Sequence, residues 1–505
     1  MSTEQSLKER INVTKKELLV LVLIIIFASV LRLWDLGGTG FNNDEAIYTG
    51  QAANLAGHKE YGEYFSIYRA HPLLLQFMVS LLIVGFGVSD TVARIMPAIL
   101  GILTIFVTYL IGKILYDRKV AILAAIVLTI LPYHIIISKE VLLDVSLAFF
   151  FALTLLFLTL YLKSPKNHWL FLMGASAGLT FLSKEIGIFA LFCSVACLFL
   201  IKRFSLKNIV IIVSSFLLAS SPYWIPILTI PEAQDAALSY WHWQTSRDPN
   251  QPDTFYLSLL SQEALGYVLG GLFVLSLIYV LKTKSIKTPQ VFMLLIWIAI
   301  PLLIIQFLAV KGFAFALPLI PPFVLLAVSF LFGKWMQKIP HYRIVIAVLI
   351  PLIFIFSGPM LHFVLDIPPI HLVGSGGEPY AREAALWIKD NVPHNGVFLT
   401  LDTRTANVIQ FYSNNKAFSL HANRNPAYTQ IDNPDLYVLN GKVNYLVYEV
   451  SLAEQLPYLK EEVRGLNQLV TKYNAIPIHT EYKTYTDSNG KKLIKPALII
   501  YSLNS

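Results

Sequence analysis

Charged residues are scarce in this chain of 505 residues: Asp, Glu, Lys and Arg make up 14% of it, and hydrophobic residues make up 56%. Soluble proteins carry about 25% charged residues, so the composition excludes an ordinary soluble protein. Apolar runs recur from Leu18 to about Val364, and a spanning helix needs about 20 such residues. The sequence therefore predicts a mainly α-helical protein with multiple membrane spans.

Cysteine and metal-ligand patterns are also nearly absent. The two cysteines, Cys193 and Cys197, lie four residues apart in one apolar run, so we expect them to be packing residues that say little about redox compartment. The eleven histidines show no metal-ligand spacing, so we predict no cofactor, and a divalent metal is possible but unsupported. No nucleic-acid motif is present, and we attribute the net charge of +8 to cytoplasmic loops.

Clusters of Lys and Arg separate the apolar runs and set their orientation, because cytoplasmic loops carry an excess of these residues. If all the clusters are cytoplasmic, spans must come in pairs between them, and eleven spans satisfy this rule. The N-terminus, which resembles an uncleaved signal anchor, is then cytoplasmic in a multi-pass cell-membrane protein. The expected spans are 18–34, 95–112, 120–137, 145–162, 168–183, 186–201, 208–228, 257–281, 290–309, 313–332 and 343–363.

One apolar run, Pro72–Val88, is about long enough to span but would turn every later basic cluster outward. We therefore predict that it lies along the outer surface or re-enters, within one long outer segment from Asp35 to Arg94. The membrane part is expected at residues 1–372.

Polar residues and short strand-like runs return after Val364, which predicts a soluble outer α/β domain over residues 373–505. It contains no catalytic motif that we can identify. The expected elements are helices at 380–391 and 406–412, strands at 397–401 and 444–450, and a hairpin of 476–485 with 493–503 around Asn489-Gly490.

Asp44 and Glu45 form an acidic pair just after the first apolar run. A carboxylate can take the proton of a hydroxyl that attacks an electrophilic carbon, and a neighbouring acid raises its proton affinity. Taken alone, such a pair is more often a solvated loop. Its predicted place on the same membrane face as further acids favours the catalytic interpretation.

A second group, Lys139, Glu140 and Asp144, opens a later outer loop, where a helix N-cap by Asp144 is an equal alternative. Isolated cations at the outer edge, Lys184 and Lys311, could converge on an anionic phosphate, although each one singly is better explained by snorkelling.

Two further residues of the long outer segment are candidates for the site. Arg94 is one of the few basic residues at an outer span end. His71, before Pro72, could orient a substrate, and a plain turn before a helix is the equal alternative.

Together these segments resemble a known family, the GT-C membrane glycosyltransferases of the protein O-mannosyltransferase and aminoarabinose transferase superfamily. The resemblance covers roughly residues 18 to 330. It is carried in order by Asn43-Asp44-Glu45-Ala46-x-Tyr48, His71-Pro72-Leu73, Ala93-Arg94-Ile95-Met96-Pro97-Ala98, Lys139-x-x-x-x-Asp144, Gly178-Leu179-x-x-Leu182-Ser183-Lys184 and, more weakly, Lys311 with Ala316-Leu317-Pro318-Leu319-Ile320-Pro321.

The resemblance implies a GT-C fold with juxtamembrane helices and an inverting hexosyl- or pentosyltransferase. Such an enzyme moves a sugar from a polyprenyl- or dolichyl-phosphate donor in the membrane lipid to an acceptor hydroxyl of a protein, lipid or glycan on the outer face. It implies that Asp44 is the base, that Asp144 lines the same cavity, and that Lys184 and Lys311 contact the lipid phosphate.

Two positions depart from the family pattern. Lys139 stands where an Arg is common, and it cannot form the same bidentate fork. Leu73 stands where a second proline is usual. Because of both departures, the acceptor of a better-known branch of the family is not a safe guide to the acceptor of this protein. The C-terminal part shows no β-trefoil repeat, and in this it resembles the prokaryotic members.

Two alternatives remain, one from another class of protein and one a different GT-C enzyme. A transporter or lipid flippase tends to place polar groups near the midplane between pseudo-symmetric halves, whereas the ionisable residues here gather at one face and no repeat is visible. An oligosaccharyltransferase-like enzyme would need a divalent ion, for which the sequence has no signature.

Overall fold

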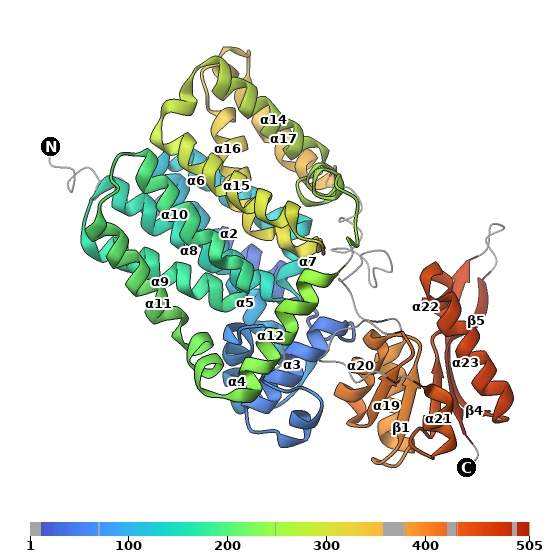
Figure 1. Ribbon diagram of the computed structural model, residues 1–505. Helices are drawn as coiled ribbons and strands as arrows, with labels where there is room; N and C mark the ends of the chain where they lie inside the picture. Colours follow the sequence, from blue (N-terminus) through green and yellow to red (C-terminus); the bar gives the residue numbers. More distant parts are fainter. Residues whose placement is uncertain are drawn as a thin grey trace.

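The computed structural model describes residues 12–68, 71–247, 249–356, 378, 380–421, 431, 433–486 and 492–503. Helices fill the chain up to residue 355, and a small sheet with helices follows from residue 381 (Figure 1). This confirms the predicted fold class, a mainly α-helical membrane protein with a small C-terminal α/β part. The predicted boundary at residues 372 and 373 lies outside the described residues, so it stays a prediction.

The helical part places a helix at each of the eleven predicted spans. Among the described residues, five segments are long and apolar enough to cross a membrane, and two bent pairs raise this number to seven. The others are shorter or more charged, so the number of spans stays a prediction. The helices in chain order are α2 (Lys15–Leu33), α5 (Asp90–Leu115), α6 (Arg118–Ile130) with α7 (Pro132–Ser138), α8 (Leu143–Lys163), α9 (Asn167–Ser183), α10 (Phe189–Leu200), α11 (Leu206–Thr229), α13 (Phe255–Ser258) leading through a π-helical turn to α14 (Gly266–Lys282), α15 (Pro289–Phe307), α16 (Ile320–Leu331) and α17 (Tyr342–Ile355).

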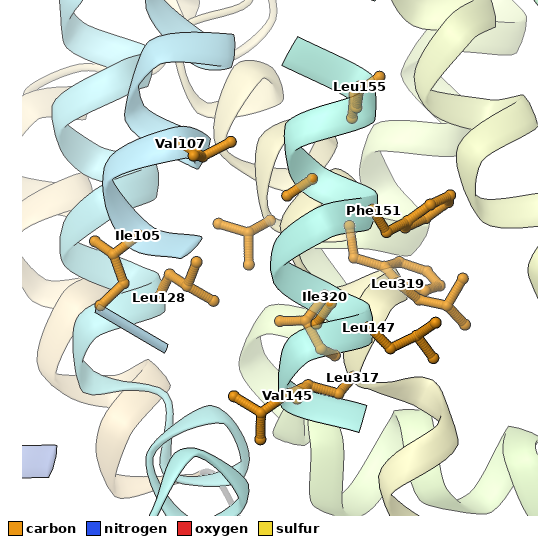
Figure 2. Packing of buried hydrophobic residues seen from close by; sticks show 14 of the residues in the cluster. Ile105, Val107, Leu128, Val145, Leu147, Phe151, Leu155, Leu317, Leu319 and Ile320 are labelled. Carbon is orange, nitrogen blue, oxygen red and sulfur yellow. The ribbon is translucent and has the colours of Figure 1, made fainter. Parts of the chain in front are cut away.

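Helix α8 lies at the centre of the apolar core and packs on α5, α9 and the 3-10 segment Phe313–Leu319 that precedes α16. Leu147 and Phe151 of α8 lie beside Leu319 in Figure 2. Phe151 also stacks on the fully buried Trp297, with ring centroids 5.3 Å apart. This packing fixes the N-terminal end of α8, where Asp144 lies.

Small residues on α9 bring α11 into close contact, as expected where helices pack within a membrane. A Cβ at Gly174 would collide with the Ile212 carbonyl oxygen, and one at Gly178 would lie 2.6 Å from that of Phe216. Cys193 and Cys197 on α10 are both buried, which confirms that they are packing residues.

Pro132 separates α6 from α7 at a bend of 63°, because a proline has no N–H to continue the helix. The fully buried Arg32 of α2 donates to the Leu128 and Thr129 carbonyls that this break leaves without helical partners, at 3.1 and 3.2 Å. Its guanidinium also lies 2.9 Å from His134 Nδ1. Arg32 therefore holds the bend that aims α7 toward the Lys139–Asp144 loop.

Two of the basic clusters lie together at one end of the helical part. Lys113, near the end of α5, pairs with Glu17 of α2 at 2.7 Å and donates to the Asn12 carbonyl at 3.0 Å. The Lys15/Lys16 and Lys113/Arg118 clusters therefore lie at the same end, as the prediction that both are cytoplasmic requires.

The segment 35–94, which is predicted to lie outside, begins and ends at the end of the helical part opposite Lys113. Arg94 Nη2 donates to the Gly40 carbonyl at 3.0 Å, so the two ends of this segment touch. Between them lie α3 (Asn43–Leu55), the 3-10 turn Lys59–Glu63 and α4 (Leu74–Phe86). With 13 residues, α4 is about 20 Å long, which is shorter than the roughly 30 Å hydrocarbon core. Because α10 and α17, with 12 and 14 residues, are similarly short and lie at predicted spans, length does not decide the matter, and that Pro72–Val88 does not cross stays a prediction.

The C-terminal part is a five-stranded sheet in the order β2-β1-β3-β5-β4. The first three strands are parallel, and β5 pairs antiparallel with both β3 and β4. The predicted helices, strands and hairpin are confirmed, the turn at Asn489-Gly490 lies outside the described residues, and β2, α21, α22 and α23 were not predicted. The elements are α19 (Ala381–Asn391), β1 (Val397–Thr400), α20 (Thr403–Ser413), β2 (Lys416–Ser419), α21 (Pro434–Leu439), β3 (Tyr445–Tyr448), α22 (Val450–Gln455), α23 (Lys460–Lys472), β4 (Ile476–Thr486) and β5 (Lys492–Ser502).

Candidate active site

Helix α3 begins at the acidic pair, and the local sequence explains why. Asn42 is its N-cap: the Asn42 side chain accepts the Glu45 N–H at 3.0 Å, and the Glu45 carboxylate accepts the Asn42 N–H at 3.2 Å. This reciprocal capping box satisfies two of the N–H groups that a helix start leaves free. Asp44 lies between the two capping residues, where the positive end of the helix dipole favours a carboxylate.

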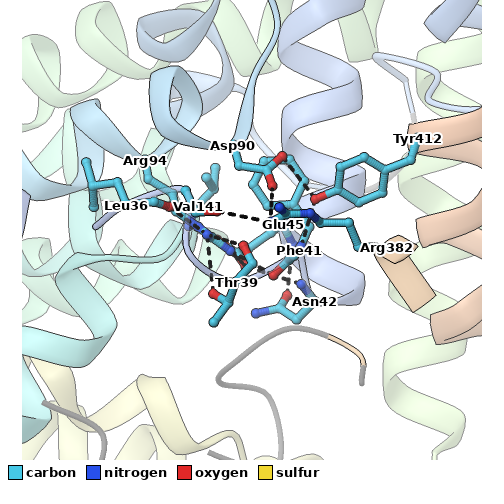
Figure 3. Close-up of polar contacts among 12 residues, drawn as sticks. Leu36, Thr39, Phe41, Asn42, Glu45, Asp90, Arg94, Val141, Arg382 and Tyr412 are labelled. Carbon is cyan, nitrogen blue, oxygen red and sulfur yellow. Dashed lines mark hydrogen bonds and ion pairs between the residues drawn. The ribbon is translucent and has the colours of Figure 1, made fainter. Parts of the chain in front are cut away.

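Glu45 is fully buried, and both of its carboxylate oxygens accept hydrogen bonds (Figure 3). Its two oxygens accept Nε and Nη2 of Arg94, both at 2.7 Å, and Oε1 also accepts the Val141 N–H at 3.0 Å. The remaining guanidinium donors of Arg94 bind the carbonyls of Leu36, Thr39 and Gly40. The Arg94–Glu45 pair thus ties three segments together: the chain before α3, the start of α5 and the loop before α8.

Asp44 has a different environment, although it is the next residue. Its side chain is solvent-accessible, yet enough protein lies around it for burial to be the main influence on its pKa. Its one described hydrogen bond is donated by Asn43 Nδ2 at 2.9 Å. Burial raises the pKa of the Asp44 carboxyl, Lys184, Asn43 and His71 oppose this rise, and Asp144 adds to it.

Asp144 and Lys184 form the second element of the site. Asp144, in the first turn of α8, accepts the Lys184 ammonium on both oxygens at 3.0 Å, and both residues are buried. Lys184 follows the end of α9, and its ammonium lies 3.7 Å from the Phe315 ring centroid. The alternative that Asp144 caps α8 is wrong, because Leu142 occupies the N-cap position.

His71 forms the third element. Its Nδ1 lies 3.1 and 2.9 Å from the two oxygens of the buried Glu185. The hydroxyl of Tyr240, on α12 (Pro231–Ser246), lies 3.4 Å from Nε2, and Gln244 donates to that hydroxyl at 2.5 Å. His71 lies just before α4, as the alternative of a turn before a helix expects, but Pro72 is not at the first helical position, because α4 begins at Leu74.

The remaining predicted residues lie around this centre. Lys139 is half-buried with Asp35 and Arg94 as charged neighbours, and Glu140 is buried in the same loop. Lys311 is buried, and its ammonium lies 3.7 Å from the exposed Asp253.

The structure therefore gathers the predicted residues into two groups. His71, Asp144 and Lys184 each act electrostatically on Asp44, whereas Glu45 and Arg94 form the ion pair described above. No described contact joins Lys311 to either group.

The C-terminal part reaches the same place, which the sequence did not predict. Glu378, close enough to Asp44 for its charge to be felt, lies 3.8 Å from Arg404 at the start of α20. Asn407 of α20 donates to Asn43 Oδ1 at 2.8 Å. The sequence did not single out these residues, nor Glu185 and Tyr240, as site residues. Each is brought to the site by contacts between residues more than a hundred positions apart in the chain.

Among the described residues, no group of three or more His, Cys, Asp and Glu side chains is arranged to hold a metal ion. The charged groups of the site pair instead as acid with base, as in Asp144 with Lys184 and Glu185 with His71. Such an arrangement can accept a proton at Asp44 and can steady a nearby anion through the cations.

A sequence profile described as dolichyl-phosphate-mannose-protein mannosyltransferase matches residues 70–225. This range contains His71, Arg94, Asp144 and Lys184, while Asp44 precedes it. A search of curated proteins finds no match.

Solved structures match over nearly the whole chain. ArnT from Cupriavidus metallidurans in the apo state is 14% identical, with 96% of this chain and 97% of that chain covered and a TM-score of 0.67. ArnT from the same organism bound to undecaprenyl phosphate is 15% identical, with 96% and 98% covered and a TM-score of 0.66. The apo oligosaccharyltransferase of Archaeoglobus fulgidus is 16% identical, with 95% and 74% covered and a TM-score of 0.60.

At these identities the structural matches show the fold, and the profile adds the family resemblance. Together they confirm the predicted resemblance to GT-C glycosyltransferases and support the predicted class of enzyme. They do not favour a transporter or flippase.

Proposed function

From this fold and this cluster, we propose that the protein transfers a sugar from a polyprenyl- or dolichyl-phosphate donor to an acceptor hydroxyl, with Asp44 as the base. The observation that carries the assignment is the state of Asp44: an accessible carboxylate whose pKa is raised by the surrounding protein and which has Lys184 and His71 as neighbours. A base of this kind can take a proton from a hydroxyl in the transition state.

The reaction needs little covalent chemistry from the protein. The acceptor oxygen bonds to the anomeric carbon as its proton passes to Asp44, and the bond from that carbon to the donor phosphate oxygen breaks with its electron pair. The sugar is thereby joined to the acceptor with the configuration of its anomeric carbon inverted, and the polyprenyl phosphate departs as an anion. The protein must orient the two reactants and stabilise the departing charge.

Lys184 and Lys311 are the cations that we assign to the donor phosphate, as the family resemblance implies. Lys184 is held by Asp144, so its position is set before a donor arrives. Lys311 has only the loose pair with the exposed Asp253 among its described side-chain contacts, so its ammonium is available for a phosphate. His71, oriented by Glu185 and Tyr240, is positioned to contact the sugar or the acceptor.

Glu45 has a positioning role in this proposal instead of a catalytic one. Its oxygens are occupied by Arg94, Asn42 and Val141, so a proton could reach it only by breaking a buried ion pair. Arg94, Lys139 and Glu140 support the same segment. We further propose that the site and the C-terminal part face outward and the N-terminus faces the cytoplasm, since the Lys113 end of the bundle lies opposite the site.

Mass spectrometry of glycans and polyprenyl-phosphate sugars in cells lacking the gene tests this function. We expect the donor to accumulate and one glycoconjugate to lose a single sugar, with both changes reversed by the wild-type gene but not by Asp44→Asn. Glu383→Gln, an exposed acid in the first turn of α19, is the matched control and should restore the wild-type pattern.

Unchanged lipids and glycans in the deletion strain would contradict the proposal. Loss of a whole oligosaccharide, with sensitivity to a chelator, would instead identify an oligosaccharyltransferase-like enzyme. The sugar that accumulates on the lipid names the donor, and the shortened product names the acceptor.

A further inference from the structure

Helix α20 of the C-terminal part docks directly on the segment that carries Asp44. Tyr412 accepts the Phe41 N–H at 2.9 Å and donates to Asp90 at 3.0 Å, as Figure 3 shows. Arg382 pairs with the same Asp90 at 3.1 Å. These contacts bring another residue of α20, Asn407, against the first turn of α3.

Asn407 is buried and begins a chain of amide hydrogen bonds that ends at Asp44. Its Nδ2 donates to its own helix, at the Thr403 carbonyl (3.0 Å), and to Asn43 Oδ1 (2.8 Å). Asn43 Nδ2 in turn donates to Asp44 Oδ1 at 2.9 Å.

The partners at the two ends of this chain fix the orientation of both amides. The Thr403 carbonyl can only accept, so the group of Asn407 that faces it must be the NH2 group. The same NH2 group then requires the carbonyl oxygen of Asn43 on its other side. The NH2 group of Asn43 is thereby left to face Asp44, which as a carboxylate can only accept.

Resting on the proposed function, we infer that Asn407 is a positioning residue: it holds the side-chain amide of Asn43, and through it the C-terminal part sets the orientation of the Asp44 carboxylate. The C-terminal part is then more than a cover for the membrane part. Docking of α20 is coupled to the geometry of the base, because a displaced C-terminal part leaves the Asn43 amide, which donates to Asp44, without its anchor.

Several other charges also act on Asp44, and they set the background for any test. Lys184 and His71 favour its charged form, whereas Asp144 disfavours it, and the C-terminal Glu378 feels its charge. None of these groups is altered by a neutral substitution at Asn407. The hydrogen bond from Asn43 also lowers the pKa of Asp44, so its loss has a predictable sign: Asp44 should hold its proton to higher pH.

The pH dependence of carbodiimide labelling tests the inference on the full-length protein in detergent. Dicyclohexylcarbodiimide reacts with the protonated form of a carboxyl group, and mass spectrometry of the peptide that contains Asp44 gives the midpoint without any donor or acceptor. We expect Asn407→Leu, which keeps the side-chain size but removes the donor, to move the midpoint to higher pH, as Asn43→Ala does. The double variant should match Asn43→Ala, because the two residues act in series.

Gln410→Ala is the matched control. Gln410 lies on the same helix, but its amide binds the Ala417 carbonyl within the C-terminal part, so its removal should leave the midpoint at the wild-type value. In transfer assays we expect Asn407→Leu to lose about tenfold in rate through misorientation of the base, with Gln410→Ala near wild type.

Two results would overturn the inference. One is a labelling midpoint for Asn407→Leu that equals the wild-type value. The other is that Asn407→Leu shifts the midpoint by the same amount in the Asn43→Ala background as in the wild type. Since labelling needs no sugar transfer, this result is separate from the fate of the proposed function. Transfer lost in Asp44→Asn together with an unshifted Asn407→Leu midpoint would refute the positioning role alone.

Discussion

Asp44 and Glu45 are adjacent acids of one helix turn, yet they lie in two regions with opposite chemistry. Around Glu45, every carboxylate oxygen and guanidinium donor has a partner within the protein. Around Asp44, the carboxylate is accessible and has one described hydrogen bond, and its charged neighbours are paired mainly with one another.

The difference shows how a fold separates a structural acid from a reactive one. A buried ion pair contributes when its hydrogen bonds are complete and becomes very costly when one partner is lost. An accessible carboxylate whose pKa burial raises can gain and lose a proton without disturbing the fold. The predictions below address the two regions in turn, and each has a control of matched type.

The largest effect is expected from breaking the Arg94–Glu45 pair. Arg94→Leu leaves the fully buried Glu45 charge without its cation, so we expect about 3–5 kcal/mol of destabilisation and a lower thermal unfolding midpoint in detergent. Arg382→Leu removes an arginine from a more exposed pair with Asp90 and should cost far less. An unfolding midpoint for Arg94→Leu equal to that of Arg382→Leu would show that the Glu45 region is not the structural one.

A smaller effect, on binding alone, is expected at the buried Lys311, whose one described side-chain ion pair is loose. Lys311→Ala should weaken donor binding about 10- to 100-fold, the worth of one or two charge-assisted hydrogen bonds to phosphate, with little change in unfolding. Titration of the protein with the polyprenyl phosphate measures this. Asp253→Ala removes its loose partner and should leave binding unchanged or tighter; unaltered binding in Lys311→Ala would remove this residue from the phosphate site.

The smallest effect concerns a third acid, Glu449, which is buried like Glu45 but accepts backbone N–H groups of Leu401 and Asp402 without a cation. Burial raises its pKa to about 8. The folded state therefore holds a proton that the unfolded chain has released, and the stability from this group is full below about pH 4 and is lost as the pH rises to about 8.

Glu449→Gln should flatten the decline of the unfolding midpoint of the full-length protein between about pH 5 and pH 9. Glu454→Gln is the control: Lys495 and Lys483 lower the pKa of that exposed acid, so it does not titrate in this range. A decline that persists unchanged in Glu449→Gln would show that this carboxyl is ionised in the fold.

The sequence predicted the fold class well, and it singled out several residues that the structure brings together, because both leave local signals. Apolar runs and basic clusters define the helices, and alternation defines the strands from Val397 onward. The Asn42-x-x-Glu45 spacing is also a capping-box pattern, and this local signal in the sequence distinguishes the structural Glu45 from Asp44.

The pairings were not predictable, because they join residues far apart in the chain. Lys184 meets Asp144 across 40 residues, and His71 meets Glu185 across 114. The contact of Asn407 with Asn43 spans 364 residues and depends on the docking of a part that has no motif of its own. These contacts follow from packing, which hydropathy and spacing do not specify.

Sugar transfer by purified Asp44→Asn protein, from the polyprenyl-phosphate donor that accumulates in the deletion strain, tests the central claim most directly. The substitution keeps the shape and the Asn43 contact but removes the base, so the account predicts a wild-type unfolding midpoint, retained donor binding and a loss of transfer by at least about 100-fold. Transfer at the wild-type rate in a folded Asp44→Asn protein would contradict it.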